Sequence, residues 1–466
     1  MSELTPNLDY TSNEPLYVQL YKYIKSEIKS GNLAVMAKLP SKRKFAEYLK
    51  VSENTIESAY EQLIAEGYIE SKARKGYFVC EVEQYHFASS MEAPSAEEKQ
   101  HIEGKYNYHF THSGVDIRTF PFSVFRRLTN QVMNMDNGEV LMLGHPQGEF
   151  DLRKEIAGYL YKSRGVNCSP SQIILGSGTQ YSMKLLLQLL DGSIFAVEDP
   201  GYHRKLVIFE KGLENVREIP LDKDGLILSK LKKSSANIVF VTPSHQFPCG
   251  MIMPIARRMQ LLKWAKEKPG RYIIEDDYDS EFRYTGMPIP ALQGLDKDEK
   301  VIYMGTFSKA LLPSLRISYM VLPRPLLEIY QEDYFFYAQT VSRTDQEVLR
   351  RFLQDGYWEK HIHKMRLVYR KKRDSLIAAI SSHFPRGAEV IGQDSGLHIL
   401  LRPNNDMSEQ ELIAKASEAG IKIYPVSQFG KNDGHTVLLG FALISEEDLS
   451  KAIRILARSW NEMNTL

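Results

Sequence analysis

The sequence predicts a multidomain fold in which a small helix-rich unit ending in a β-hairpin precedes a large α/β unit. The chain has 466 residues, which is too many for one hydrophobic core and favours two or three domains. Residues 15–80 carry helical apolar stripes followed by two short strands. From about residue 106 onward, short apolar strands alternate with helical patterns, which is typical of helices packed on a mainly parallel sheet.

Composition divides the chain into three parts. We expect the N-terminal unit over 12–80, a linker over 81–105 and the α/β unit over 106–466, with a smaller C-terminal α+β part at about 340–466. The linker is predicted because 81–105 holds six Glu against two Lys, with Ser, Ala and Pro and no apolar period. This composition is typical of solvated connecting segments.

The overall composition excludes several classes of protein. The formal net charge is +1, so a nucleic-acid partner must be argued from local clusters of charge. The three cysteines (Cys80, Cys168 and Cys249) form no CxxC pair, which argues against a disulfide framework or a zinc site and fits a reducing compartment. The N-terminus lacks a signal-peptide pattern, and no apolar run reaches about 18 residues. We therefore expect a cytoplasmic protein with no metal site and no membrane partner.

Three helices are predicted in the N-terminal unit, the last two with helix-turn-helix spacing. Gly31 ends the first helix, Ser41 opens the second, and Ser52 can cap the third after a tight turn at Lys50–Val51. The apolar positions at helical spacing are, helix by helix, Leu16, Leu20, Ile24 and Ile28; Phe45, Ala46 and Leu49; and Ile56, Tyr60, Leu63 and Ile64. This arrangement lets the third helix enter a DNA major groove by its N-terminus.

A basic hairpin follows the third helix. Residues 67–79 (GYIESKARKGYFV) predict two short strands whose tip holds Lys72, Arg74 and Lys75. Such a wing would place cations beside phosphates or in a minor groove. The alternative is a helical hairpin with a β-ribbon that only packs against a protein partner, because spacing alone does not separate the two.

The N-terminal unit resembles the winged helix-turn-helix of GntR-type regulators. The shared strings are LPSKR at 39–43, AEYLKVS at 46–52 and AYEQLIAEGY at 59–68. The resemblance implies DNA contacts from residues at the starts of the second and third helices, with neighbours in the wing: Ser41, Lys42, Arg43, Ser52, Asn54, Thr55, Lys75 and Gly76.

Two acidic residues depart from this family pattern. Glu53 and Glu57 stand where the family often carries Arg. A carboxylate is repelled by phosphate, but it can accept a hydrogen bond from a cytosine amino group. The operator sequence of better-known relatives therefore does not transfer to this chain.

The segment YMGTFSKALLPSLRISYM (303–320) is the most informative part of the α/β unit. Lys309 follows an apolar strand between Thr306 and Ser308 on one side and Arg316 on the other. Such a lysine can form a Schiff base with an aldehyde cofactor, and an arginine seven residues later can bind a phosphate through two hydrogen bonds. A lone lysine after a strand is more often a surface residue, so the interpretation depends on partners elsewhere.

Three other strand ends supply such partners. In RYIIEDDYDSEF (271–282) the strand ends in carboxylates, one of which can pair with a protonated pyridine nitrogen. The backbone N–H groups of GSGTQ (176–180) and the hydroxyl of Thr179 can bind a phosphate where a strand meets a helix. Tyr202 follows a further strand and can stack on a flat ring. Each has an ordinary structural explanation, but four such features in this order favour a cofactor site.

With these strings the chain resembles fold-type I aminotransferases and, taken with its N-terminus, the MocR/GabR subfamily of GntR regulators, over roughly 15–80 and 106–455. The resemblance implies pyridoxal phosphate (PLP) as cofactor, with Lys309 as the internal-aldimine lysine, Asp276 beside the pyridinium nitrogen and Tyr278 on the ring hydroxyl. It implies a ring stacked on Tyr202. It also implies a phosphate surrounded by Thr179, Gln180, Thr306, Ser308 and Arg316.

Two positions differ from working aminotransferases. Phe247 replaces an Asn that hydrogen-bonds the cofactor's ring oxygen, and KNDGHTVLLGFA (431–442) has Gly434 and His435 where an Arg binds the substrate α-carboxylate. We therefore name Arg204, which matches an effector contact in a related regulator, and His435 as candidate effector-binding residues. Regulators of this type resemble head-to-tail, domain-swapped homodimers.

These observations predict a PLP-dependent transcription regulator that binds double-stranded promoter DNA and senses a small amine or amino acid, or PLP itself. The alternative is an active PLP-dependent aminotransferase with a fused DNA-binding domain. The departures at Phe247 and at Gly434–His435 favour the regulator. Because Lys309 is present, a residual aminotransferase half-reaction is still compatible with this function. A DNA-bound scaffold with an inactive cofactor site is disfavoured by the complete set of Lys309, Asp276 and Arg316.

Overall fold

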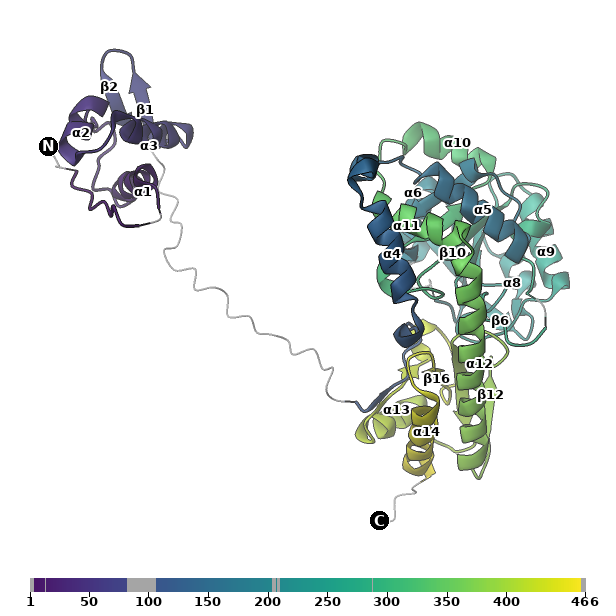
Figure 1. The fold of residues 1–466 in the computed structure, drawn as a ribbon. Coiled ribbons are helices and arrows are strands. Elements are labelled where there is room, and N and C mark those ends of the chain that lie inside the picture. The colour runs from purple at the N-terminus through teal and green to yellow at the C-terminus, as the bar shows by residue number, and fades with distance from the viewer. Residues whose placement is uncertain are drawn as a thin grey trace. The chain divides into compact units, whose positions relative to one another are not determined.

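The computed structural model describes residues 4–12, 14–81, 106–202, 207, 210–286 and 288–461. The chain forms two compact units, Met1–Gln100 and His101–Leu466, each of which is drawn in Figure 1. The expected linker at 81–105 lies, except for its first residue, outside the described residues. Within the described ranges, no helix combines the length and the apolar character that a membrane span requires.

The N-terminal unit is a winged helix-turn-helix. It consists of α1 (Leu16–Lys29), α2 (Lys42–Leu49), α3 (Glu53–Ala65), β1 (Ile69–Lys72) and β2 (Gly76–Val79), and β1 pairs with β2 in antiparallel fashion. Ser41 and Ser52 are the N-caps of α2 and α3, each accepting a hydrogen bond from the backbone N–H three residues on. Both caps confirm the predicted helix starts.

One predicted core position in this unit is wrong. Ile56, Tyr60 and Leu63 are buried as expected, but Ile64 is 38% exposed and Ala59 is buried in its place. At about 100° per residue, positions 59 and 64 flank the stripe set by the other three on opposite sides. The burial of Ala59 and the exposure of Ile64 show that the core lies toward the side of Ala59.

The large part of the C-terminal unit is built on an eight-stranded sheet of order β4-β11-β10-β9-β8-β5-β6-β7. The strands are β4 (Ile173–Gly176), β5 (Phe195–Asp199), β6 (Val216–Asp222), β7 (Gly225–Leu226), β8 (Ile238–Val241), β9 (Tyr272–Asp277), β10 (Val301–Thr306) and β11 (Ser318–Val321). Only the pairs made by β11 and by β7 are antiparallel. The mainly parallel sheet predicted from the sequence is confirmed.

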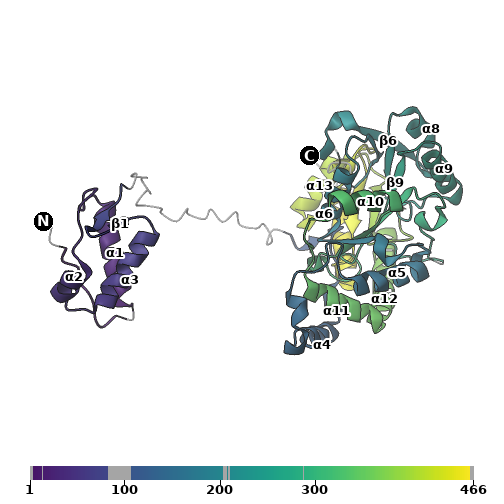
Figure 2. The same cartoon turned by 90° about the horizontal axis from the view of Figure 1, so that it is seen from above.

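Helices cover both faces of this sheet. They are α4 (Phe122–Val132), α5 (Phe150–Arg164), α6 (Thr179–Leu189), α8 (Leu228–Lys233), α9 (Ile255–Lys266), α10 (Arg324–Asp333) and α11 (Arg343–Gln354). Alternate residues of β8 enter different buried clusters: Ile238 packs with residues of α6, and Val239 packs with residues of α9. This alternation is that of a strand covered on both sides, and Figure 2 shows α8 and α9 together on one side of the unit.

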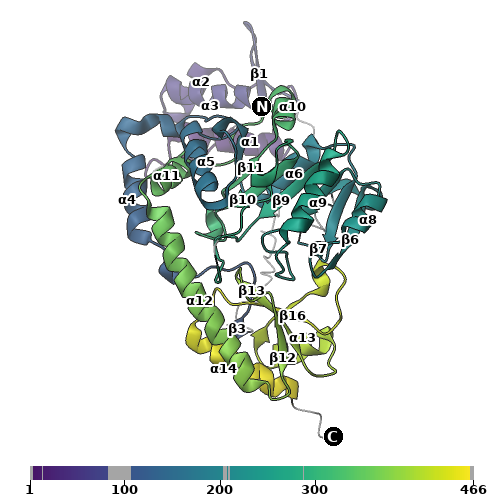
Figure 3. The same cartoon turned by 90° about the vertical axis from the view of Figure 1, so that its right-hand side faces the viewer.

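The smaller part is an α+β layer joined to the large part by a long helix. Its antiparallel sheet, β12-β13-β16-β15, consists of Ala388–Ile391, His398–Pro403, Val437–Gly440 and Tyr424–Pro425. Helices α13 (Glu409–Glu418) and α14 (Glu446–Asn461) flank it, and β3 (Tyr108–His109) pairs with β14 (Ile421–Lys422). The 27-residue helix α12 (Tyr357–His383) runs alongside both parts (Figures 1 and 3).

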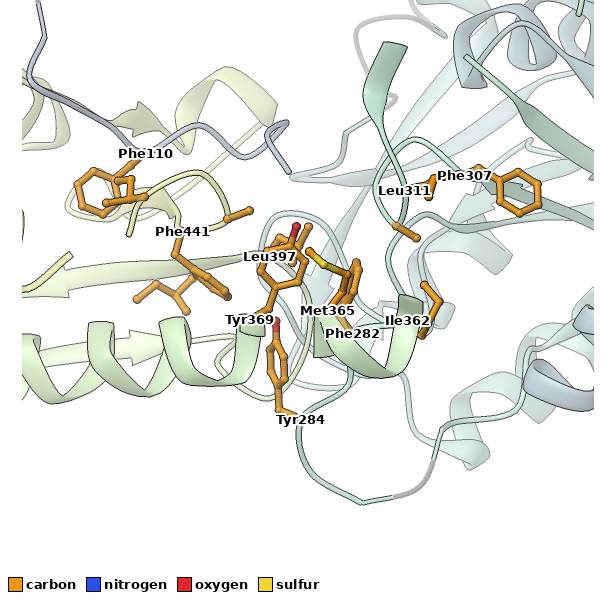
Figure 4. Packing of buried hydrophobic residues seen from close by; sticks show 14 of the residues in the cluster. Phe110, Phe282, Tyr284, Phe307, Leu311, Ile362, Met365, Tyr369, Leu397 and Phe441 are labelled. Carbon is orange, nitrogen blue, oxygen red and sulfur yellow. The ribbon is translucent and has the colours of Figure 1, made fainter. Parts of the chain in front are cut away.

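Aromatic side chains fill the junction beside α12. Phe282 meets Tyr369 edge-on, with ring centroids 4.9 Å apart, and Figure 4 shows these rings next to Met365 and Leu397. The Tyr369 hydroxyl accepts a hydrogen bond from the backbone N–H of Asp116 at 2.9 Å. The two parts of the C-terminal unit therefore share one hydrophobic core.

A buried ion pair at the end of β9 leads to a stability prediction. The Arg164 Nε lies 2.7 Å from Asp277 Oδ2, and their side chains are 4% and 1% exposed. The Tyr303 hydroxyl donates to the same oxygen. We expect Asp277→Asn to lower the free energy of unfolding by about 3–5 kcal/mol, because it leaves a buried guanidinium without its counter-ion. Urea denaturation followed by circular dichroism measures the change.

The matched control is Asp191→Asn, which removes a carboxylate paired with Lys211 at 2.7 Å but 85% exposed. Solvent screens this pair, so its removal should leave the urea midpoint unchanged. Equal destabilisation by both substitutions would contradict the assignment of a special role to the buried pair.

Candidate functional site

A cavity of about 200 Å³ lies at the carboxyl ends of the central strands. Its lining includes all nine residues named from the sequence as cofactor contacts: Thr179, Gln180, Tyr202, Asp276, Tyr278, Thr306, Ser308, Lys309 and Arg316. It also includes four residues that were not among those contacts: His112, Ser113, Phe247 and Pro313. The structure thus brings together side chains that lie up to 204 positions apart in the sequence.

The sheet topology explains this convergence. Strands β9 and β10 are parallel neighbours, with Asp276 opposite Met304, so Asp276 and the chain leading to Lys309 emerge at the same edge. Helix α6 begins at Thr179, directly after β4. Ligands of open α/β sheets bind at this edge.

One end of the cavity suits a phosphate. The first turn of α6 offers free backbone N–H groups there, and the Ser308 Oγ is buried without a hydrogen-bond partner in the described structure. Gly178 has φ +100°, and a Cβ at this position would overlap the guanidinium of Arg316. Glycine therefore allows Arg316 to approach the helix N-terminus. An orphaned hydroxyl, a helix N-terminus and a cation fit an anionic group.

Lys309 is the nucleophile of this cavity. Its Nζ donates a hydrogen bond to the carbonyl oxygen of His112. Burial lowers the pKa of Lys309 to about 8, although the charges of Asp279 and Asp276 act in the opposite direction. A larger fraction of the amine is therefore neutral, and able to attack a carbonyl, near neutral pH than for an ordinary lysine.

This pKa leads to a prediction for the cofactor-free protein. Only the neutral amine attacks an aldehyde, so the rate of PLP uptake should rise about tenfold per pH unit below pH 8 and level off above it. Stopped-flow absorbance between pH 6 and 10 measures this rate. A rate that continues to rise steeply from pH 8.5 to 10 would mean an ordinary lysine, whose pKa is 10.5.

Part of the cavity lining is aromatic. Phe247 is 3% exposed and meets Tyr202 edge-on, with ring centroids 5.2 Å apart. The same ring lies 5.6 Å from His112 and 4.8 Å from Phe429. Phe247 therefore closes the cavity with an apolar edge, as expected from a residue that replaces a hydrogen-bonding Asn.

The structure leaves both candidate effector contacts as predictions. Arg204 lies outside the described residues. His435 is not among the residues that line this cavity, and its Nδ1 lies 2.9 Å from the carbonyl oxygen of Met407. Effector binding by either residue therefore stays a prediction.

His112 is a lining residue that sequence reasoning missed. Burial lowers its pKa to about 4, with a further contribution from Lys309, so the ring is neutral. It comes from the segment after β3, more than 60 positions before GSGTQ (176–180), the first motif named in the α/β unit. No local pattern marks this segment as part of the cavity, because its position depends on the pairing of β3 with β14.

In the N-terminal unit, the candidate DNA contacts gather at three places. Ser41, Lys42 and Arg43 lie at the start of α2, and Ser52, Asn54 and Thr55 at the start of α3. Lys75 and Gly76 lie at the hairpin turn, where the Lys75 N–H donates to Lys72 and Gly76 has φ +107°.

The structure accounts for one of the acidic departures. Glu57 forms an ion pair with Lys42, so its charge is balanced within the unit. Arg43 is 79% exposed and lies 3.4 Å from the Glu47 carboxylate. Arg43 thus remains the more accessible cation at the start of α2.

Comparison with known proteins assigns both units. Residues 16–79 match the model of the bacterial regulatory proteins of the gntR family, and residues 116–456 match aminotransferase class I and II. The chain is 46% identical over 465 residues to the uncharacterized HTH-type transcriptional regulator YdeL of Bacillus subtilis, covering 98% of this chain and 99% of the relative. It is 32% identical to the probable rhizopine catabolism regulatory protein MocR of Rhizobium meliloti, covering 96% and 94%.

The C-terminal unit also resembles solved enzymes. Kynurenine aminotransferase of Pyrococcus horikoshii, solved in complex with PMP, superposes with a TM-score of 0.68 and 26% identity, covering 78% of this chain and 93% of the enzyme. The fold family therefore implies PLP as the cofactor, and the cavity lining fits it.

A GntR helix-turn-helix joined to a fold-type I aminotransferase-like domain defines a class of DNA-binding transcription regulators. The chain belongs to the MocR-type members of this class.

Proposed function

We propose that this regulator senses PLP, or a small amine or amino acid that reacts with PLP at Lys309, and binds promoter DNA as a homodimer in the cytoplasm. The observation that carries this proposal is the cavity. It contains a buried lysine of lowered pKa, and one of its ends is suited to a phosphate. The same cavity has Phe247 where an aminotransferase has a hydrogen-bonding Asn. PLP supplies an aldehyde that condenses with amines and a ring that withdraws electrons.

Each lining residue has a role in holding the cofactor. Asp276 is 4% exposed and would pair with the ring nitrogen, while Tyr202 would stack on the ring. Arg316, Thr179 and the orphaned Ser308 hydroxyl would hold the phosphate. Lys309 would hold the cofactor through its aldehyde group, because its amine is the nucleophile in the cavity lining.

Exposed apolar side chains support the dimer. Leu141, Met142 and Leu143 are 70%, 68% and 82% exposed, and Phe336 is 77% exposed. The two stretches lie close together, because the rings of His145 and Phe335 have centroids 5.3 Å apart. Apolar patches of this kind are usually covered in an assembly. We propose that a second copy of the chain covers this one, in the head-to-tail arrangement that the family suggests.

The proposal is tested by coupling between ligand and DNA. We expect PLP, or an amino acid added to the PLP-loaded protein, to change DNA affinity by roughly 5- to 150-fold, which is the usual range of allosteric coupling. We propose Arg204 as the cation that receives an effector carboxylate. Arg204→Ala should keep the spectrum of bound PLP and the basal DNA affinity while losing the response to amino acids. Fluorescence anisotropy of a labelled promoter fragment measures both.

Arg386→Ala is the matched control, because this exposed arginine lies outside the cavity lining. It should respond as the unaltered protein does. A full response in Arg204→Ala would place the effector elsewhere. If neither PLP nor any amino acid tested changes the DNA affinity, the proposed sensing function is wrong.

A further inference from the structure

A buried histidine lies behind one of the cavity residues. His245 is 2% exposed, and its Nδ1 lies 3.0 Å from both carboxylate oxygens of Asp279. The same Nδ1 lies 2.9 Å from the hydroxyl of Tyr278. Tyr278 lines the cavity, whereas His245 and Asp279 do not.

The contacts define which atom carries the proton. A carboxylate only accepts hydrogen bonds, so the Nδ1 facing Asp279 must be protonated. The Nε2 of His245 is buried and has no hydrogen-bond partner in the described structure. A proton on Nε2 would leave a buried N–H unpaired, at a cost in free energy, so the neutral ring with its proton on Nδ1 fits best.

This tautomer constrains Tyr278. The Nδ1–H of His245 is shared between the Asp279 carboxylate and the hydroxyl oxygen of Tyr278. The Tyr278 oxygen therefore accepts a hydrogen bond from the histidine. The proton of the tyrosine hydroxyl is then free to point elsewhere. Burial raises the pKa of Tyr278 well above its usual value, so the hydroxyl keeps this proton at neutral pH.

The neighbours of His245 hold the ring in place without competing for the proton. A Cβ at Gly396, where φ is +76°, would overlap the His245 ring, so the backbone lies directly against it. The ring of His398 lies 5.2 Å away, and its Nε2 is 3.0 Å from the Pro248 carbonyl oxygen. Burial lowers the pKa of His398 well below its usual value, so this neighbour is uncharged.

We propose that His245, held by Asp279, is a positioning residue that fixes Tyr278 as a hydrogen-bond donor into the cofactor cavity. The arrangement matters because Phe247 offers no polar group in this wall. The inference rests on the proposed cofactor site. It gives His245, two positions before Phe247, an indirect role in the place of the hydrogen bond that an Asn makes in aminotransferases.

The test compares two substitutions of His245 in two backgrounds. His245→Asn places an amide N–H near the position of Nδ1, whereas His245→Leu removes it. His245→Leu should weaken PLP binding about 3- to 10-fold, the effect of one hydrogen bond. It should also raise, by roughly half a pH unit to one unit, the midpoint at which the visible band of bound PLP titrates, because a donor stabilises negative charge on its acceptor.

His245→Asn should bind and titrate as the unaltered protein does. In a Tyr278→Phe background, His245→Leu should cause no further change, because its effect passes through the tyrosine hydroxyl. Additive effects in the two backgrounds would overturn the proposal and leave His245 a packing residue.

A third variant keeps the proposal testable if His245→Leu fails to fold. His245→Gln places its amide nitrogen near Nε2 rather than Nδ1, and it should titrate like the loss of the histidine. Equal behaviour of the Gln and Asn variants would overturn the proposal. Unaltered protein that binds no PLP would overturn the proposed function and this inference together, whereas normal binding and titration in every His245 variant would remove the inference alone.

Discussion

Lys309→Ala is expected to abolish the covalent attachment of PLP. Reduction with borohydride should add the mass of the cofactor to the unaltered protein and none to the variant, because Lys309 is the lysine in the cavity lining and its neutral form is favoured by burial. The visible absorbance of the purified protein should be lost with it. Intact-mass spectrometry after reduction measures the result.

Lys263→Ala is the matched control, because this lysine is exposed on α9. Its reduced protein should carry one cofactor, as the unaltered protein does. A reducible cofactor linkage in Lys309→Ala would contradict the assignment, provided that circular dichroism shows the same fold. Cofactor that remains bound without such a linkage would be held by the phosphate end alone.

The second large effect concerns DNA. Residues 81–466 lack the winged helix-turn-helix. We expect them to bind a DNA selected by the intact chain roughly 1,000-fold more weakly, which is the lower end of the usual ratio between specific and non-specific affinity. Arg43→Ala in the intact chain should lower affinity and reduce the slope of log affinity against log salt by about 0.9, the value for one lost phosphate contact. Fluorescence anisotropy at several salt concentrations measures both.

Lys22→Ala serves as control for the loss of one positive charge, because this lysine lies on α1, is 60% exposed and pairs with Glu14. It should leave the salt dependence unchanged. Equal binding by residues 81–466 and by the intact chain would mean that DNA is bound by the C-terminal unit.

Most of the cofactor site could be predicted from the sequence, because its residues follow strands that are recognisable as short apolar runs. Lys309, Asp276 and Thr179 each stand at the end of an apolar run, and parallel strands bring such ends to one edge. The same local logic placed Ser52 as the cap of α3. Local pattern and tertiary position agree at these residues.

The rest depends on pairings that no local pattern encodes. His112 reaches the cavity only because β3 joins β14 from more than 300 positions away. The contact between His245 and Asp279 joins two different loops, and the balance of Glu57 by Lys42 joins two helices. The prediction that Ile64 is buried failed for another reason. At the edges of an apolar helical stripe, the exposed fraction of a side chain differs strongly between neighbouring positions.

The hydrogen bond from Lys309 to the His112 carbonyl has a mechanical consequence. The segment 108–112 is anchored to the small part by β3 and by the hydrogen bonds of Phe110 with Lys422 and Gly440. His112 stands only six positions after Tyr106, where the described C-terminal unit begins. Any ligand that draws the amine away from this carbonyl would therefore remove one of the contacts that hold segment 108–112 in the C-terminal unit.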